Sequence, residues 1–456
     1  MTDRQARFLT GSIFRHVVVM TLTGAIGLMT LFVVDLADLY FLSRLGDTNI
    51  TAAIGFAGTL DFANLSLSIG TGIAAAALVS RNLGAGKPQR AKEFATTTMV
   101  VALAVSAAYT LLVDIFIGPI LSLLGATGEA AHLAKLFIWT LSPGFVFLGG
   151  ALACSFSMRG LGDARRAMFI TLSAAIGTLI LDPIFIFQFG WGIQGTAAAN
   201  AIADALAFFV GFHGLYKVHD FLERPTWAGL KRDLPEITGI ASPAVISQLA
   251  TPFAAAYLTY VLAPYGNDIV GAGTVVNRIV PVAFGIIFSL SGSVGPIIGQ
   301  NFGAKDFTRV SRTLTDAIIF AFLYALATSL GLYLFRHQLA AAFSVTGRAA
   351  ELVAFFATYI AASWAFVGSQ FVAMAAFNNL GKPTYSTYLN WGKSTIGTIP
   401  FALVGAAVAG PEGVMIGVGL GGVVFGIAAA ILAFRLVRQL SGSASAYVPS
   451  GGASRQ

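Results

Sequence analysis

The stretch RNLGA at residues 81–85 returns as QNFGA at residues 300–304, 219 positions further along the chain. At the same offset Arg90 returns as Arg309, and the pair LG at residues 161–162 returns at residues 380–381. In each half the motif follows a long apolar segment and opens a short basic stretch. A duplication of this kind inside an apolar chain is typical of transporters built from two similar helical bundles.

The composition indicates a membrane protein. Hydrophobic residues make up 56% of the 456 residues and charged residues only 10%, whereas soluble domains usually carry about 25% charged residues. Twelve apolar runs are long enough to cross a bilayer as helices, and no alternating strand pattern is visible. The runs cover residues 17–43, 51–80, 94–117, 134–158, 167–189, 193–216, 237–263, 271–299, 314–335, 352–377, 384–409 and 413–434. The sequence therefore predicts an all-α membrane protein with twelve transmembrane helices.

The longest internal loop divides the chain into two similar halves. Residues 217–236 have mixed charge and contain Pro225 and Pro235. We expect an N-terminal six-helix bundle over residues 1–228 and a C-terminal six-helix bundle over residues 229–456, with a disordered tail from about residue 441. Because six crossings return the chain to its starting side, the two bundles are expected to be parallel repeats.

The positive charges predict the orientation in the membrane. Most of the 27 Lys and Arg residues precede the first run, follow the last, or lie in alternate loops. This asymmetry predicts that both termini are cytoplasmic, and we expect the protein in a bacterial inner membrane. The same scattered charges explain the net charge of +7, so no nucleic-acid partner is expected. The only cysteine, Cys154, falls within a span and cannot form an intramolecular disulfide.

Acidic residues within the predicted spans of the first half are the main functional signal. They are Asp35, Asp38, Asp61, Asp114, Asp182 and Asp204. Each costs about 2.5–3.5 kcal/mol at the bilayer centre, and we expect no Lys or Arg inside the same spans to compensate them. Helical spacing groups them on common faces: Asp35 with Asp38, Asp61 with Asn64, and Asn200 with Asp204. The simplest arrangement is an acidic cavity inside the first bundle that opens outward.

Such carboxyl groups are expected to hold a proton near neutral pH, because burial and neighbouring acids both disfavour the charged form. A proton that a cationic compound can displace makes an exchange site. The alternative is that some of the acids only support packing through hydrogen bonds to Ser or Thr. That alternative fits Asp114 best, and Asp38 and Asp182 least.

The second half has a different charge pattern. Arg278 and Lys393 fall within its predicted spans. They either bind carbonyls or lipid, or provide counter-charges in a central cleft. The five histidines show no metal-binding spacing, and no Ser/His/Asp or Cys/His set is visible. The sequence therefore predicts no metal, no cofactor and no enzymatic activity.

Several short stretches resemble a known family. DLYFLSRLG at residues 38–46 resembles the first-span signature of the multidrug and toxic compound extrusion (MATE) family. NLGAG at residues 82–86 and RGLGD at residues 159–163 resemble its inter-span loops, and the match covers roughly residues 14–437. The resemblance implies a V-shaped pair of six-helix bundles. It also implies an antiporter that exports organic cations in exchange for protons or sodium.

One stretch points to a branch of that family. LDPIF at residues 181–185 resembles the fifth-span signature of the DinF-type branch, whose first-span and fifth-span aspartates form a cation-coupling site. Carried over, the resemblance assigns coupling to Asp38 and Asp182. Asn200 and Thr178 depart from that branch, which often has threonine and asparagine at these positions. The sodium-coupled NorM-type branch fits less well, because its acidic positions fall at Thr251 and at residue 367 or 368, which are not acidic here.

We therefore expect a proton-coupled exporter of amphipathic, cationic organic compounds. The expected coupling residues are Asp38, Asp182, Asp35, Asn200 and Asp204. The expected substrate-cavity residues are Asp61, Asn64, Thr178, Asn277, Gln370, Asn390 and Lys393. Two alternatives stay open: sodium coupling at the same acids, and a lipid-linked precursor flippase of the same superfamily that would use Lys393 and Arg278 to bind phosphate. The expected partners are small organic substrates, the coupling cation and membrane lipid, for a monomeric protein.

Overall fold

The computed structural model describes residues 6–43, 48–343 and 345–446, which form helices and turns without any strand. The first half contains α1 (Ile13–Ser43), α2 (Thr48–Gly84), α3 (Pro88–Leu123), α4 (Gly128–Leu161), α5 (Ala164–Pro183) and α6 (Ile193–His213). The second half contains α7 (Trp227–Gln248), α8 (Ala250–Leu262), α9 (Asn267–Ala283), α10 (Gly285–Gly303), α11 (Phe307–Leu334), α12 (Arg336–Ala342), α13 (Gly347–Phe355), α14 (Trp364–Asn379), α15 (Pro383–Ser394) and α16 (Ile399–Ala446).

The described helices account for the predicted crossings. Ten segments are long and apolar enough to cross a bilayer, and an eleventh arises if α9 and α10, which meet at a 47° bend, form one span. The last of the ten, Pro383–Ser443, crosses twice because the chain reverses at Gly410, whose φ is +59°. Beyond the reversal, Gly413 lies against the backbone of Gly405. The all-α, twelve-helix prediction is confirmed.

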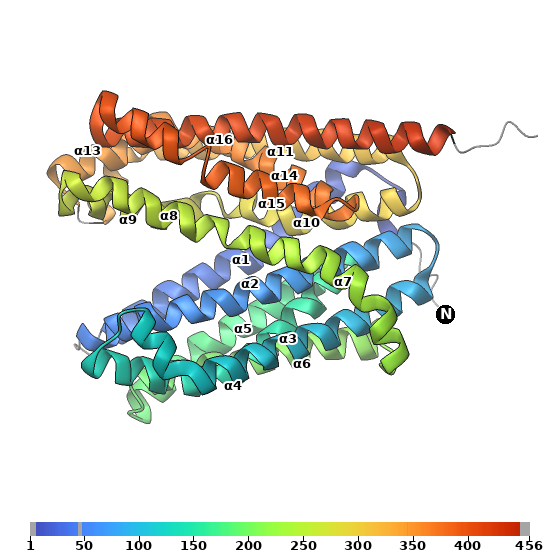
Figure 1. The fold of residues 1–456 in the computed structure, drawn as a ribbon, viewed down its shortest axis with the longest axis horizontal. Helices are drawn as coiled ribbons and strands as arrows, with labels where there is room; N and C mark the ends of the chain where they lie inside the picture. Colours follow the sequence, from blue (N-terminus) through green and yellow to red (C-terminus); the bar gives the residue numbers. More distant parts are fainter. Residues whose placement is uncertain (1–5, 44–47, 344, 447–456) are drawn as a thin grey trace, which may run out of the picture.

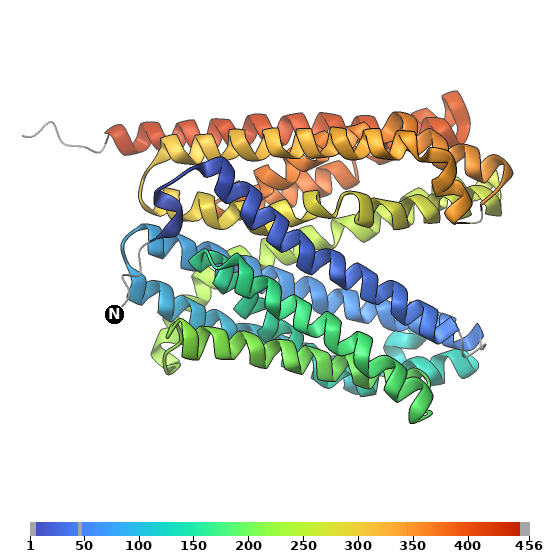
Figure 2. The same ribbon diagram turned by 180° about the vertical axis from the view of Figure 1, so that it is seen from behind.

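The helices form two lobes that converge at one end of the molecule. Helices α2–α6 make the N-lobe and helices α8–α16 the C-lobe (Figure 1). Helix α7 packs on both α2 and α15, and α1 packs on both α5 and α10. Both described ends of the chain lie at the converging end of the molecule, which we call the termini end (Figure 1). From there the lobes diverge, which gives the V shape seen in both views (Figures 1 and 2).

The expected division of the chain at residues 228 and 229 stays a prediction, because α7 begins at that point and contacts both lobes. The structure describes the beginning of the expected C-terminal tail as helical, since α16 continues to Ala446. Residues 447–456 lie outside the described part of the chain.

The duplicated motif lies where the lobes touch. A Cβ atom on Gly84 of α2 would overlap the carbonyl group of Gln300, and one on Gly303 of α10 would overlap that of Arg81. Only glycine permits two helices to approach so closely at these positions. The repeated glycines are therefore the two halves of one contact between the lobes.

Side-chain hydrogen bonds join the lobes at the same end. Arg81 of α2 donates to the carbonyl oxygens of Asn379 and Asn378 at the end of α14, with Nε at 2.7 Å and Nη2 at 2.6 Å. In the opposite direction, Gln300 Nε2 of α10 donates to the carbonyl oxygen of Gly160 in α4, at 2.9 Å. These side chains occupy equivalent positions of the repeat, and each crosses from its own lobe to the other.

The second repeated glycine pair ends two helices. Gly162 follows α4 with φ +85°, and Gly381 follows α14 with φ +81°, a conformation that stops a helix and favours glycine. Asp163 then caps α5, because its Oδ1 accepts a hydrogen bond from the backbone N–H of Arg166 at 3.1 Å. Burial raises the pKa of Asp163, but the contact with His219 and the bonds from Arg166 outweigh it, so the pKa lies below its usual value.

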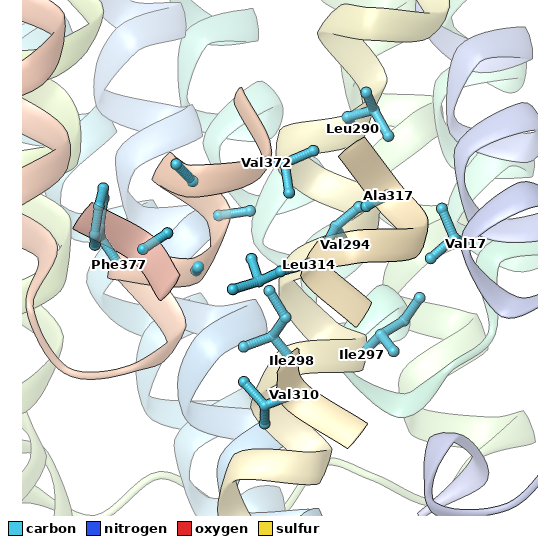
Figure 3. Close-up of a cluster of buried hydrophobic side chains, with 14 of the residues drawn as sticks. Val17, Leu290, Val294, Ile297, Ile298, Val310, Leu314, Ala317, Val372 and Phe377 are labelled. Carbon is cyan, nitrogen blue, oxygen red and sulfur yellow. The ribbon is translucent and has the colours of Figure 1, made fainter. Parts of the chain in front are cut away.

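A buried apolar cluster anchors the beginning of α1 in the C-lobe (Figure 3). Val17 of α1 belongs to the same cluster as Val294 of α10, Leu314 of α11 and Phe377 of α14. Each of these side chains is completely buried. Helix α1 therefore starts in the core of one lobe and carries Asp38, near its other end, toward α5 and α6 of the other lobe.

Candidate functional site

Three helices bring a chain of polar side chains together in the N-lobe. Thr178 Oγ1 of α5 donates to Asn200 Oδ1 of α6 at 3.2 Å. Asn200 Nδ2 donates in turn to Asp38 Oδ2 of α1 at 3.3 Å and to the carbonyl oxygen of Thr196 at 3.1 Å. Thr178 and Asn200, which differ from the expected branch, are thus bonded to each other. The hydrogen bond from Thr178 holds the amide oxygen of Asn200, so the amide N–H groups of Asn200 point toward the carboxyl group of Asp38.

Asp182 completes this group. Its side chain is completely buried, and its carboxyl group lies close enough to that of Asp38 to interact directly. Neither Asp182 oxygen, nor Asp38 Oδ1, has a hydrogen-bond donor among the described residues. Helix α5 ends at Pro183, directly after Asp182, and a π-helical turn follows over Ile184–Gln188. Three of the four carboxyl oxygens of the pair therefore lack a donor among the described residues, which is costly inside a membrane protein, so the pair can bind a shared proton or a cation.

Asp61 and Asp204 form a second acidic group. Asp61 of α2 and Asp204 of α6 are near enough for their charges to interact. The side chain of Tyr109 on α3 is also near enough to Asp61 for an electrostatic interaction. Asn64, one turn further along α2, is buried and donates to the carbonyl oxygen of Phe145 at 3.4 Å. The structure therefore places Asp204 with Asp61, whereas the sequence grouped it with the coupling residues.

Asp114 and Asp35 are the two remaining acids of the first half, and the structure describes the side chain of Asp114 but not that of Asp35. Asp114 accepts a hydrogen bond from Ser142 Oγ at 3.1 Å, as the packing interpretation expects. Asp35 lies in α1, but its side chain is outside the described residues. Its expected place beside Asp38 stays a prediction.

The expected polar residues of the second half fall into separate places. Gln370 of α14 and Asn390 of α15 are buried and meet at 3.5 Å, and Asn390 also donates to the carbonyl oxygen of Ser247 at 2.7 Å. Asn277 is exposed on α9 and is not part of that group. Lys393 of α15 forms no ion pair with a described residue. Among the described residues, no group of His, Cys, Asp and Glu side chains is arranged to hold a metal ion.

The sequence interpretation missed Arg159. The RGLGD stretch was expected in a loop, and no Lys or Arg was expected inside the first-half spans. Instead α4 continues to Leu161, so Arg159 lies within the helix, with its Nε buried and without an acceptor among the described residues. The apolar run stops at Met158 because the next residue is charged, whereas the helix stops only at Gly162. A charged residue just before a Leu-Gly helix end was the signal that could have placed it.

Comparison with known sequences supports the arrangement seen here. The MatE family model matches the chain twice, over residues 25–184 and residues 243–404, once in each half. A FAD transporter of Shewanella oneidensis is 28% identical over 442 residues, which cover 96% of this chain and 97% of that protein. The multidrug export protein MepA of Staphylococcus aureus is 28% identical over 316 residues, or 67% of this chain and 68% of that protein.

Known structures have the same fold. The Vibrio cholerae MATE transporter VcmN in its bent form superposes with a TM-score of 0.89 at 25% identity, covering 94% of this chain and 98% of that one. The twice-matched family model, the twelve helices in two lobes and this superposition agree. The chain therefore belongs to the MatE family of multidrug and toxic compound extrusion transporters, and it is a multi-pass membrane transporter rather than an enzyme.

Proposed function

We propose that this chain exports amphipathic organic compounds, principally cationic ones, in exchange for protons. The observation that supports the proposal is the pair of Asp38 and Asp182, two neighbouring carboxyl groups of which three of the four oxygens have no donor among the described residues. A shared proton supplies the missing donor, and its release leaves a site for a cation. The named function of the relative MepA, multidrug export, agrees with this substrate class.

We also propose an orientation, because export requires one. Positively charged side chains gather at the termini end, in or directly after the turns that follow α2, α4, α10 and α14. They include Lys87, Arg165, Lys305 and Lys382. By the positive-inside rule this end faces the cytoplasm, so the lobes diverge toward the outside. The proposed location is a bacterial inner membrane, with the protein acting as a monomer.

The coupling proposal is tested with purified protein in proteoliposomes. We expect Asp38→Asn and Asp182→Asn each to abolish proton-driven transport of ethidium, because an amide cannot release a proton. Asp114→Asn is the matched control, since an asparagine oxygen still accepts the hydrogen bond from Ser142. Wild-type transport should stop when a protonophore removes the gradient. Transport driven by a sodium gradient at clamped pH would support sodium coupling instead, and full activity of both variants would refute the site.

A second candidate function is export of an anionic aromatic compound. The observation that favours it is Lys393, a cation in α15 without an ion-pair partner among the described residues. The FAD transporter of Shewanella oneidensis is similar over nearly the whole chain, and FAD joins aromatic rings to a charged diphosphate. The flippase alternative would use the same lysine for a lipid phosphate, but the acidic N-lobe favours soluble compounds that exchange with a cation.

A further inference from the structure

The guanidinium group of Arg159 lies between the lobes near the termini end and is partly exposed. Arg159 lies two residues before the end of α4, and its Nη1 sits between α1 and α10. A Cβ atom on Gly24 of α1 would lie 2.9 Å from Nη1, and one on Gly292 of α10 would lie 3.3 Å from it. Glycines on both sides therefore make the room that this side chain occupies. The side chain belongs to the N-lobe, whereas Gly292 belongs to the C-lobe.

Arg159 differs from Arg81 and Arg309, two other arginines at this end, in having no acceptor among the described residues. Arg81 donates to two carbonyl oxygens at the end of α14, and Arg309 donates to Asn301 Oδ1 and to backbone carbonyls. Arg159 forms no hydrogen bond or ion pair with any described residue, and its Nε is buried. The side chain as a whole is partly exposed, so this state of the protein leaves a strong anion-binding group without an acceptor from the protein.

Structural roles account for only part of this arrangement. The guanidinium carbon lies 5.6 Å from the centre of the Phe156 ring, which is a weak cation–π contact. The negative end of the α4 dipole also favours a cation in its last turn. Neither interaction supplies an acceptor to the five N–H groups of the fork. A role limited to packing would be served as well by an uncharged side chain of similar length.

Two hydroxyl groups stand beside the guanidinium. Ser289 Oγ and Ser293 Oγ of α10 lie 2.5 and 3.0 Å from the Cβ position of Gly24, next to Arg159 Nη1. At present they donate to the backbone of α1, Ser289 to Thr21 O at 2.9 Å and Ser293 to Met20 O at 3.0 Å. If the lobes separate at the termini end, the guanidinium and the hydroxyl groups that face it are uncovered together.

We propose that Arg159 is an anion-binding residue, which holds the phosphate or carboxylate of an acidic transported compound when the lobes separate at the termini end. The planar fork can bind either group through two parallel hydrogen bonds. An anion that binds the guanidinium and the hydroxyl groups more tightly in the separated state shifts the protein toward that state. The inference rests on the proposed export function and widens the range of exported compounds to those with an acidic group.

The test uses two compounds that differ by one phosphate. Riboflavin and riboflavin 5′-phosphate share the same ring system, so the ratio of their transport efficiencies isolates recognition of the phosphate. In proteoliposomes we expect Arg159→Gln to raise the KM for riboflavin 5′-phosphate by about tenfold or more, as for loss of a hydrogen bond to a charged group. The KM for riboflavin should stay within about twofold, and Arg159→Lys should recover part of the difference because it keeps the charge.

Arg165→Gln is the matched control, because it removes a positive charge from an exposed position at the same end of the molecule. It should leave both KM values unchanged. Equal effects of Arg159→Gln on the two flavins would show a packing role and overturn the inference, as would no effect on either. If the wild type transports ethidium but not riboflavin 5′-phosphate, the inference fails while the export function stands. Transport of none of the three compounds would refute the export function itself.

Discussion

Thr178 carries no charge, yet it decides how the acidic pair is held. Its hydroxyl group donates to Asn200 Oδ1, which leaves the Asn200 amide N–H groups facing Asp38 and the helix backbone. Without that bond the amide can rotate and present its oxygen to the carboxyl group, which would repel it. The hydroxyl thus acts on Asp38 through a neighbour rather than by contact.

We therefore expect Thr178→Val, which has nearly the same shape, to slow proton-driven efflux by roughly fivefold, the value of about one hydrogen bond. Thr178→Ser, which keeps the hydroxyl, should be close to wild type. Thr30→Val is the control, because the one hydrogen bond of Thr30 Oγ1 to a described residue goes to Ile26 O of its own helix. Initial rates in proteoliposomes measure the effect. Equal rates for Thr178→Val and Thr30→Val would show that the Thr178 hydroxyl group is not needed to orient the Asn200 amide.

The sequence predicted the members of the acidic group, but not how they meet. The cost of burying a charge singled out all four acids, Asp38, Asp61, Asp182 and Asp204, because the sequence shows them inside apolar runs. The assignment of Asp38 and Asp182 to one site came from a resemblance to family signatures, because residues so far apart have no spacing from which contact can be deduced. Arg159 was missed because it directly follows an apolar run. A charged residue in that position is assigned to a loop unless the end of the helix is known.

Helix α5 depends on its first turn, where Asp163 accepts from the backbone of Arg166 and lies 3.0 Å from His219. The folded pKa of Asp163 lies below its usual value. The stabilisation is therefore complete above the unfolded pKa of about 3.9 and is lost as the pH falls through the folded pKa. The stabilisation by Asp163 does not decrease as the pH rises, because its carboxyl group stays ionised.

We expect Asp163→Asn, which can still cap the helix, to lower the melting temperature at pH 7 because it removes the charge. Asp163→Ala should lower it further, since loss of an N-cap costs roughly 0.5–2 kcal/mol. Thermal unfolding in detergent across pH 2 to 7.5 measures both variants. The difference between wild type and Asp163→Asn should shrink toward the acid end. A difference that is constant with pH would mean that the charge of Asp163 contributes nothing.

The helices were predictable from hydrophobicity, because a segment that crosses a bilayer must be long and apolar and must satisfy its backbone hydrogen bonds internally. The reversal near Gly410 was also predictable, since two runs end and begin on either side of a Gly-Pro pair. Breaks inside the C-lobe spans were not. The bend between α9 and α10 at Phe284 and the break between α7 and α8 at Leu249 occur within continuous apolar sequence, where packing rather than composition sets the backbone.

At the scale of the whole molecule, the duplicated motif explains how the lobes close at the termini end. Gly84 and Gly303 each lie against the backbone of the other lobe, and Arg81 and Gln300 donate across the same contact. The same contact would have to open for the lobes to rock apart. A side chain placed between them should therefore favour the separated state without touching the acidic pair or Arg159.

We expect Gly84→Ala and Gly303→Ala each to increase the separation of the lobes at the termini end, because the new methyl group overlaps a backbone carbonyl. Spin labels at the exposed positions Lys87 and Lys305, in a Cys154→Ala background, report that distance. Gly55→Ala is the control on the same helix, since nothing lies near its Cβ position. The two glycine variants should show a longer distance population than the control, and slower efflux, because a transporter biased to one state completes fewer cycles. Distance distributions identical to that of Gly55→Ala would mean that the repeated glycines only pack the helices and do not control how the lobes close.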